Sequence, residues 1–556
     1  TALVDGVYTG EGSGFNLTQK VQVTVEIKDG KIASVTVGDN GETMGMIAAV
    51  EDKWIPRVVE NQSLAVDAIC GATASSNGVR AAVVNALESA GMDVSGLYTP
   101  IAKVDAAEEY NVDIVVVGMG SSGTTAALAA AESGANVLAI DKAGKWGGTG
   151  ATTSGPANVN APSQVASEIV DWKDPINGVH TKAAGEKLVD ADALYATWTD
   201  YTTVDGVQGA KPELIAKVIY ESGETCDWLQ SYGFEFTPAV GFVGGKWAIF
   251  SSYVGQKQLT ESFFAKAYDR YTEMGGQYLL ETEATELIMQ DGKAVGVRAT
   301  KADGTSVTIN AKAVILCTGG FAGSDAMQEK YIGQAYKLFG MSTNDGKMIE
   351  SAIENGAATR AIGMYPMSHF VAPTVITTQF SAADNDIPYG LVCTAEGMAV
   401  NMKGERFINE SSIAMNAFYQ GNHFYYVYSK EQIDILREQG LSANASGRYL
   451  TQGGIKADVP LTNIDTVIDA GIEAGFIYKA SSLDELAAQI GGDFSADALK
   501  ASVAGYNPEN DAFGKDASKF ERLGTVAADS EYYVAFTGAP YIYSTCGGLD
   551  VNENLQ

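Results

Sequence analysis

Residues 112–123 read VDIVVVGMGSSG, and this stretch decides the fold of the larger part of the chain. The almost unbroken apolar run Val112–Val117 is typical of a parallel strand that is covered on both faces. Glycines follow at the spacing G-x-G-x-x-G, at Gly118, Gly120 and Gly123, and a helical pattern begins directly after them. Strand, glycine-rich turn and helix in this order predict an α/β domain that binds a dinucleotide.

The three glycines of this turn have separate physical roles. The first permits the tight turn, the second lets a pyrophosphate approach the backbone, and the third lets the helix pack on the strand. Asp141 closes the next strand, Val137–Ile140, where its carboxylate can accept hydrogen bonds from ribose hydroxyls. Because FAD and NAD share this fingerprint, the spacing alone leaves the choice between them open. The predicted contacts are Gly118, Gly120, Ser122, Gly123 and Asp141.

A second Gly/Ser/Thr-rich run, residues 142–155 (KAGKWGGTGATTSG), follows the acidic residue directly. Taken alone it is either a flexible loop or a second segment that contacts the cofactor. A further buried strand, Ala313–Cys317, ends in a similar turn, and Asp345-Gly346 precedes another helical stretch.

The first 95 residues have the pattern of a separate, small α+β unit. Valine and isoleucine alternate with polar residues over 21–27, Asp29-Gly30 supplies a tight turn, and the alternation then resumes. This pattern predicts a β-hairpin. Helical patterns follow at about 54–66 and 77–90.

The segment DAICGAT, residues 67–73, stands just before the second of these helices. Its polar residues could cap the helix, and the same geometry favours a phosphate at the helix N-terminus. With the hairpin and a glycine-rich turn at residues 10–14, it resembles the FMN-binding domain family, in which a flavin transferase esterifies FMN onto the last residue of D-x-x-[S/T]-G-A-[S/T]. The resemblance implies covalent FMN on Thr73 and assigns the motif's aspartate to Asp67. Cys70 departs from the usual Ser or Thr without changing the acceptor.

From residue 112 onward the glycine segments resemble those of the fumarate reductase/succinate dehydrogenase flavoprotein family. The resemblance implies flavin contacts from Lys142, Gly147, Gly148, Thr149, Thr153, Ser154, Gly155, Thr318, Gly319, Gly320 and Asp345. The FMN-type domain narrows the resemblance to the soluble fumarate and urocanate reductase branch. It implies an α/β, Rossmann-like FAD-binding domain of glutathione-reductase type with an inserted α+β capping domain, and FAD held non-covalently. In that branch FMN relays electrons to FAD, FAD delivers a hydride to one alkene carbon, and a side chain protonates the other.

This organisation gives a predicted set of domains. The expected segments are the covalent FMN-binding domain 1–95, the linker 96–111, the FAD-binding domain 112–360, the capping domain 361–537 and a return to the FAD-binding domain at 538–556. The expected partners are a small unsaturated substrate, an upstream electron donor of anaerobic respiration and a flavin transferase.

The segment GERFINE, residues 404–410, matches the family pattern G-x-R-F-x-N-E. In fumarate reductases the proton-donating arginine lies four residues later, where this chain has Ala414. The family's His-Pro is replaced by Tyr365-Pro366, its Thr-Glu falls near Tyr389-Gly390, and no histidine stands before Thr545. A dicarboxylate would be buried without its partners at a cost of several kcal/mol, so we expect a substrate other than fumarate.

Tyrosines take the place of these charged residues. They favour a larger, less charged, aromatic or polycyclic substrate that carries an enone or enoate, because a phenol can donate a proton or polarise a carbonyl. The predicted proton donors are, in order, Tyr365, Tyr389 and Tyr419, with His369 and His423 as alternatives. The other tyrosines of this pattern are Tyr425, Tyr426, Tyr541 and Tyr543.

The composition excludes several classes of protein. A net charge of −31 with three histidines argues against nucleic-acid binding, which needs a basic surface. No apolar run approaches the roughly 20 residues of a membrane span, and the five cysteines contain no C-x-x-C pair.

The chain begins at Thr1 and ends at Gln556, soon after a T-x-GG-L segment beyond which the family continues. We therefore expect an extracytoplasmic protein, its leader absent from this sequence, that is truncated at its C-terminus.

Two other functions remain open from the sequence. One is the reverse chemistry, a dehydrogenase of ketosteroid type, against which the FMN relay argues. The other is a non-enzymatic electron carrier whose FAD site lost its proton donor.

Overall fold

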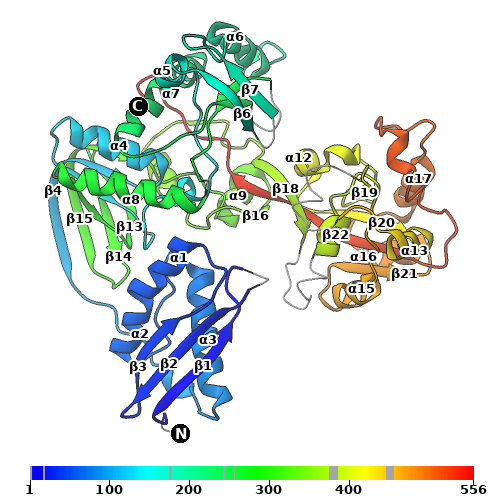
Figure 1. The fold of residues 1–556 in the computed structure, drawn as a ribbon, viewed down its shortest axis with the longest axis horizontal. Coiled ribbons are helices and arrows are strands. Elements are labelled where there is room, and N and C mark those ends of the chain that lie inside the picture. Colours follow the sequence, from blue (N-terminus) through cyan, green and yellow to red (C-terminus); the bar gives the residue numbers. More distant parts are fainter. Residues whose placement is uncertain are drawn as a thin grey trace. The chain divides into compact units, whose positions relative to one another are not determined.

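The computed structural model describes residues 3–16, 19–174, 178–241, 246–255, 257–374, 386–445 and 456–556 (Figure 1). The chain divides into two units by its internal contacts. Unit 1 contains residues 1–319, 346–361 and 548–556, and unit 2 contains 320–345 and 362–547. Within the described residues, no helix is both long enough and apolar enough to span a membrane.

The N-terminal part of unit 1 is the predicted hairpin extended by one strand (Figure 1). Strands β1 (Gly6–Gly12), β2 (Val21–Lys28) and β3 (Lys31–Val37) pair antiparallel, and the apolar residues of β2 are all buried while the polar residues between them lie on the other side. Helix α3 (Thr73–Ser89) packs on this sheet. The helix predicted at about 54–66 starts earlier and ends earlier than expected: α1 (Met44–Ala49) leads through a π-helical turn (Val50–Trp54) into α2 (Ile55–Asn61).

The glycines at residues 10–14 were expected to form a turn, and this expectation is wrong for the first two of them. Gly10 and Gly12 lie in β1, where a Cβ atom would overlap the backbone of α3. Glycine is therefore required at these two positions because the helix and the strand approach closely, not because the chain reverses direction.

The larger part of unit 1 is built on a mixed sheet with the strand order β12-β5-β4-β15-β14-β13. The first four strands of this order pair parallel to one another. β14 then pairs antiparallel to β15, and β13 pairs antiparallel to β14. Apolar clusters cover both faces of the sheet. Helices α4 (Ser121–Glu132), α8 (Lys257–Glu273) and α10 (Lys347–Glu354) belong to this part of the unit. The strands are β4 (Ala107–Val117), β5 (Val137–Ile140), β12 (Gln277–Leu279), β13 (Thr282–Gln290), β14 (Lys293–Lys301) and β15 (Ser306–Leu316).

Smaller elements complete unit 1. They are α5 (Pro162–Ala166), the hairpin β6 (Ile169–Asp174) and β7 (Gly178–Lys182), α6 (Ala191–Tyr201), the pair β8 (Thr203–Val204) and β9 (Val207–Gln208), α7 (Pro212–Ser231), the pair β10 (Val240–Gly241) and β11 (Ala248–Phe250), and the pair β17 (Thr359–Arg360) and β23 (Gly548–Leu549).

Unit 2 is an α+β unit centred on the long strand β22 (Tyr533–Ser544) (Figure 1). The first ten residues of β22 are buried, because apolar clusters cover both faces of its sheet. The other strands are β16 (Lys337–Leu338), β18 (Met367–Pro373), β19 (Met398–Val400), β20 (Phe424–Ser429) and β21 (Ile477–Ala480). The helices are α9 (Asp325–Ile332), α11 (Asp386–Leu391), α12 (Ile413–Asn416), α13 (Lys430–Gln439), α15 (Ile464–Glu473), α16 (Leu483–Ile490) and α17 (Ala496–Gly505).

Some structural boundaries differ from the predicted ones. Strand β4 starts at Ala107, so the last residues of the predicted linker 96–111 belong to a strand. Residues 320–345 group with the capping unit, and the chain returns to unit 1 at Gly548 rather than at 538. The return comes later because β22 continues the capping sheet as far as Ser544.

Candidate functional site

The glycine turn after β4 is shaped by its own backbone at two of its three glycines. Gly118 has a φ of 98°, and a Cβ atom there would overlap the carbonyl oxygen of Cys317. A Cβ atom at Gly123 would overlap the carbonyl of Gly118. At Gly120, by contrast, the nearest protein atom to a Cβ would be the Gly147 oxygen at 3.8 Å. The protein itself therefore tolerates a side chain at Gly120, and the free space there fits the close approach of a pyrophosphate.

The N-terminus of α4 has donors available for an anion. Gly120 is its N-cap, and none of the described side chains caps this helix. The first backbone N–H groups of a helix have no partner within it, and those of Ser122 and Gly123 lie in this first turn. This is the arrangement in which a helix binds a phosphate.

Asp141 is fixed at the end of β5 beside this turn. Its Oδ2 accepts a hydrogen bond from the Met119 N–H at 2.6 Å, and its Oδ1 accepts one from the Ala143 N–H at 2.8 Å. Burial raises the pKa of Asp141, while these two hydrogen bonds oppose the rise. Each carboxylate oxygen keeps a lone pair, so the group can still accept from a ribose hydroxyl.

The second glycine run packs directly on the first. The Gly147 N–H donates to the Met119 carbonyl at 2.8 Å, and Gly147 and Gly148 have φ values of 102° and 48°. A short 3-10 helix (Gly148–Thr152) follows and contains Thr149. Lys142, Thr149, Thr153 and Ser154 are at least partly accessible, whereas a Cβ atom at Gly155 would overlap the Ser251 carbonyl. The structure thus brings the two predicted cofactor segments together.

The remaining predicted contacts divide between the two units. Thr318 and Gly319 follow β15 in unit 1, where the Cys317 N–H donates to the Val117 carbonyl at 2.7 Å. Gly320 and Asp345 belong to unit 2. There, a Cβ atom at Gly320 would overlap the hydroxyl of Thr545, a contact that the sequence did not predict.

The predicted FMN acceptor lies where it can be modified. Thr73 is exposed and is the first residue of α3, with Ala72 as the N-cap. Asp67 is also exposed and pairs with Lys103 at 2.5 Å. Sequence reasoning missed Glu42, a buried carboxylate that accepts from the Ser75 hydroxyl at 2.5 Å and from the Asn16 N–H at 2.9 Å. No motif marks Glu42, because its partners come from distant parts of the sequence.

Two of the three predicted proton donors lie together in unit 2. The rings of Tyr365 and Tyr419 are in edge contact with centroids 5.5 Å apart, and both contact Phe418. Their exposed fractions are 42% and 56%. Tyr389 packs elsewhere, against a small cluster that contains Tyr541. The structure therefore places Tyr365 and Tyr419 in one aromatic cluster and Tyr389 in another, and the proton donor stays a prediction.

Tyr419 also lines a cavity of about 600 Å³ in unit 2, together with His423, Lys403 and Asp493. His423 contacts the Asn422 amide oxygen at 2.9 Å through Nδ1, and burial lowers its pKa. This favours a neutral imidazole. The side chain of His369, the other alternative donor, lies outside the described residues.

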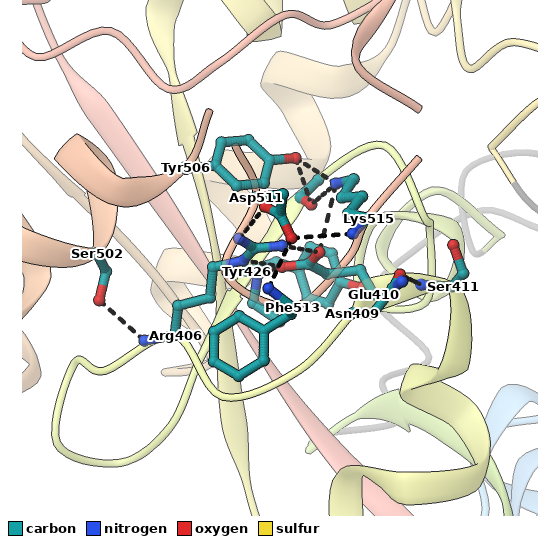
Figure 2. Close-up of polar contacts among 12 residues, drawn as sticks. Arg406, Asn409, Glu410, Ser411, Tyr426, Ser502, Tyr506, Asp511, Phe513 and Lys515 are labelled. Atoms are coloured by element: carbon teal, nitrogen blue, oxygen red, sulfur yellow. Dashed lines mark hydrogen bonds and ion pairs between the residues drawn. The ribbon is translucent and has the colours of Figure 1, made fainter. Parts of the chain in front are cut away.

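The GERFINE segment forms a buried charge network in unit 2 (Figure 2). Arg406 donates to both carboxylate oxygens of Glu410 at 3.0 Å, and it also pairs with Asp511. Lys515 lies 3.4 Å from Glu410, and burial lowers the pKa of Lys515 to about 8. Two cations and two anions balance here, so the network has a structural role. Ala414, at the position of the family's donor, lies in an apolar core.

These features define a class of protein. A dinucleotide-binding glycine turn, an acidic residue at the next strand and an inserted α+β unit are the architecture of an FAD-dependent flavoprotein. The chain belongs to the FAD binding domain family, whose model matches residues 113–556, and an FMN-binding domain model matches residues 14–88. The described residues fit both cofactors, through the free space at Gly120 and the exposed Thr73 at a helix N-terminus.

Curated relatives include several reductases. An NADH:acrylate oxidoreductase of Vibrio harveyi is 27% identical over 99% of this chain, which spans 56% of that protein's length. A vinyl phenol reductase of Lactiplantibacillus plantarum is 26% identical over 81% of this chain and 87% of its own. A urocanate reductase and fumarate reductases are also among the relatives. Among solved structures, a 3-ketosteroid Δ1-dehydrogenase from Sterolibacterium denitrificans matches with a TM-score of 0.52 and 16% identity, covering 80% of this chain and 90% of its own, which shows the shared fold.

Proposed function

We propose that this chain is a flavin-dependent reductase of an activated carbon–carbon double bond in an α,β-unsaturated carbonyl or carboxylate compound. The observation that carries the proposal is that one chain has two features that fit flavins, an exposed threonine at a helix N-terminus (Thr73) and a glycine turn with free space at Gly120. The relatives whose names specify acrylate and vinyl phenol support the same chemistry.

The reaction adds one hydride and one proton across the double bond. The glycine turns around Gly120 and Gly147 would hold FAD, which would supply the hydride, and Thr73 would hold FMN, which would supply the electrons of an upstream donor. The chain's own side chains must then hold the substrate and protonate the second carbon. Tyr365 and Tyr419 are our candidates, because their phenols are partly exposed and lie in one aromatic cluster.

The proposed substrate is an uncharged or singly charged compound, and an aromatic one would pack on these rings. With Ala414 in an apolar core, a second carboxylate has no arginine at the family's position. Fumarate reductases among the relatives make fumarate the main competitor.

An anaerobic assay with reduced methyl viologen separates these substrates. The panel should contain enones, cinnamate-like acids, acrylate, urocanate and fumarate. We expect fumarate to react at least about a hundredfold more slowly than the best compound, because a buried, unpaired carboxylate costs several kcal/mol. Turnover of fumarate faster than every other compound would overturn this substrate class.

A ketosteroid-type dehydrogenase is the second candidate, because a tyrosine pair can also polarise the carbonyl of a saturated ketone. It predicts oxidation of that ketone with a quinone-like acceptor at rates above the reduction of any alkene.

Attachment of FMN requires a flavin transferase. Three expectations stay predictions: the upstream electron donor, a role in anaerobic respiration and an extracytoplasmic location. The location can be tested by coexpressing the chain with a flavin transferase and fractionating the cells.

A further inference from the structure

Glu281 has an unusual backbone conformation in the connection between β12 and β13. Its φ is 53°, in the left-handed region that residues with a side chain rarely adopt. Its N–H donates to the Ala143 carbonyl at 2.9 Å, and the next residue, Thr282, donates to the Asp141 carbonyl at 2.8 Å. The backbone of Glu281 is therefore tied to the loop that carries the ribose-binding carboxylate. Such outliers cluster where structure serves function.

The side chain of Glu281 extends to the FMN-binding domain, which belongs to the same unit. Arg57 in α2 donates to both of its oxygens, Nη1 to Oε1 at 2.9 Å and Nη2 to Oε2 at 2.6 Å. Lys53 lies 3.6 Å from Oε2. The Glu281 side chain is 14% exposed. Burial alone raises the pKa of Glu281, but Arg57 and Lys53 outweigh this effect and lower it. The Arg57 side chain is 37% exposed, so the pair is partly buried, and a bidentate, charge-assisted pair is among the stronger polar contacts.

A second contact joins the FMN-bearing segment to the same loop. The Gly144 N–H donates to the Cys70 carbonyl at 3.1 Å, three residues before the Thr73 acceptor. A Cβ atom at Gly144 would overlap the Cγ2 methyl of Ile69. Gly144 does not have a positive φ, so its glycine is explained by this close approach rather than by backbone conformation.

We propose that Arg57, Glu281, Gly144 and Cys70 form a docking contact that holds the FMN-bearing segment against the FAD-binding loop, and that they are positioning residues for electron transfer between the two flavins. The inference rests on the proposed two-flavin function and deepens it. Electron transfer through protein slows steeply with distance, so a contact that fixes the two segments fixes the rate. Two electrons would pass one at a time from reduced FMN to FAD, with one proton released to solvent from FMN N5 and one taken up from solvent at FAD N5, so that FAD gains the hydride equivalent that the alkene receives.

Flash photoreduction of the holoprotein tests the docking contact. The FAD site is first loaded with an 8-substituted FAD analogue whose absorbance is shifted from that of FMN. A photoexcited deazaflavin with a sacrificial amine then injects electrons into exposed flavin, and bleaching of the shifted band follows their passage to the FAD site without any alkene present. We expect Glu281→Gln and Arg57→Gln to slow this passage about tenfold, because they weaken a charge-assisted pair that sets the docked population. The charge swap Arg57→Glu with Glu281→Arg should restore most of the rate. Gly144→Val should slow the passage as well, because it separates the segments by steric overlap.

Matched controls keep the result specific. Lys217→Gln removes an exposed ion pair on α7, and Gly96→Ala adds a methyl group in open space, so neither should change the rate. Thr73→Ala reports electrons that enter FAD directly. If the Gly144→Val protein loses FAD, its slow passage says nothing about docking. The rate in Arg57→Gln then tests the docking contact, because Arg57 lies outside the FAD-binding loop.

Unchanged passage in fully flavin-loaded Glu281→Gln and Arg57→Gln would overturn the inference. Passage that depends on these residues in a protein that reduces no alkene would instead contradict the proposed reductase and leave the docking contact standing. The two failures are thus distinguishable.

Discussion

The glycine turn of unit 1 and the tyrosine cluster of unit 2 are encoded in different ways. At Gly118 and Gly123 the backbone itself leaves no room for a side chain, so the residue type is set by local geometry. Tyr365 and Tyr419 are brought together by separate elements, and many residue types could occupy their partly exposed positions. In the glycine turn the residue type is thus set by the backbone, whereas in the tyrosine cluster it is set by the substrate that the side chains bind.

The largest effect should come from separating the two kinds of glycine. Gly123→Val places atoms on the Gly118 carbonyl, so we expect loss of FAD together with a destabilisation of about 3 kcal/mol. Gly120→Ala has room in the protein, so we expect a melting temperature close to that of the wild type but weaker FAD binding. Flavin content after gel filtration and thermal denaturation measure both. Equal effects at the two positions would remove the distinction between packing and ligand approach.

A smaller effect is expected in the tyrosine cluster. If the Tyr365 phenol donates the proton, Tyr365→Phe lowers kcat/KM by about 10² to 10⁴ with little change in flavin content. Tyr201→Phe, at an exposed tyrosine of α6, is the matched control. A loss of activity in Tyr389→Phe with none in Tyr365→Phe and Tyr419→Phe would assign the donor to the other cluster.

The smallest effect is a pH dependence of stability at Lys515. Its folded pKa of about 8 lies below the ordinary value of 10.5 because the side chain is buried. Between these values the unfolded chain binds more protons, so this group makes the free energy of unfolding rise with pH from 8 to 10.5. Lys515→Met should reduce that slope in urea denaturation, whereas Lys500→Met, at an exposed ion pair, should not. Identical slopes in the wild type and Lys515→Met would show that the network does not couple to this proton.

The sequence predicted what periodicity and backbone geometry encode. Strand Val137–Ile140 has its predicted bounds, because its apolar run is covered on both faces. The first half of β4 was missed because it is polar, and it is held by contacts such as that of Glu108 with Lys301 at 2.6 Å. Gly10 and Gly12 were read as a turn because a strand glycine packed on a helix has the same local pattern.

Side chains whose partners are distant in sequence could not be predicted. Glu42 and Glu281 stand in no motif, and their importance comes from Ser75 and Arg57, which only folding brings near. The separation of Tyr389 from Tyr365 likewise depends on the packing of unit 2.

The most direct test of the two-flavin account is acid precipitation of the purified holoprotein, followed by mass spectrometry of its peptides. FAD should appear in the supernatant, while FMN should remain on the peptide that contains Thr73. Thr73→Ser should keep the bound FMN and Thr73→Ala should lose it. Release of both flavins to the supernatant from the wild-type protein would contradict the account.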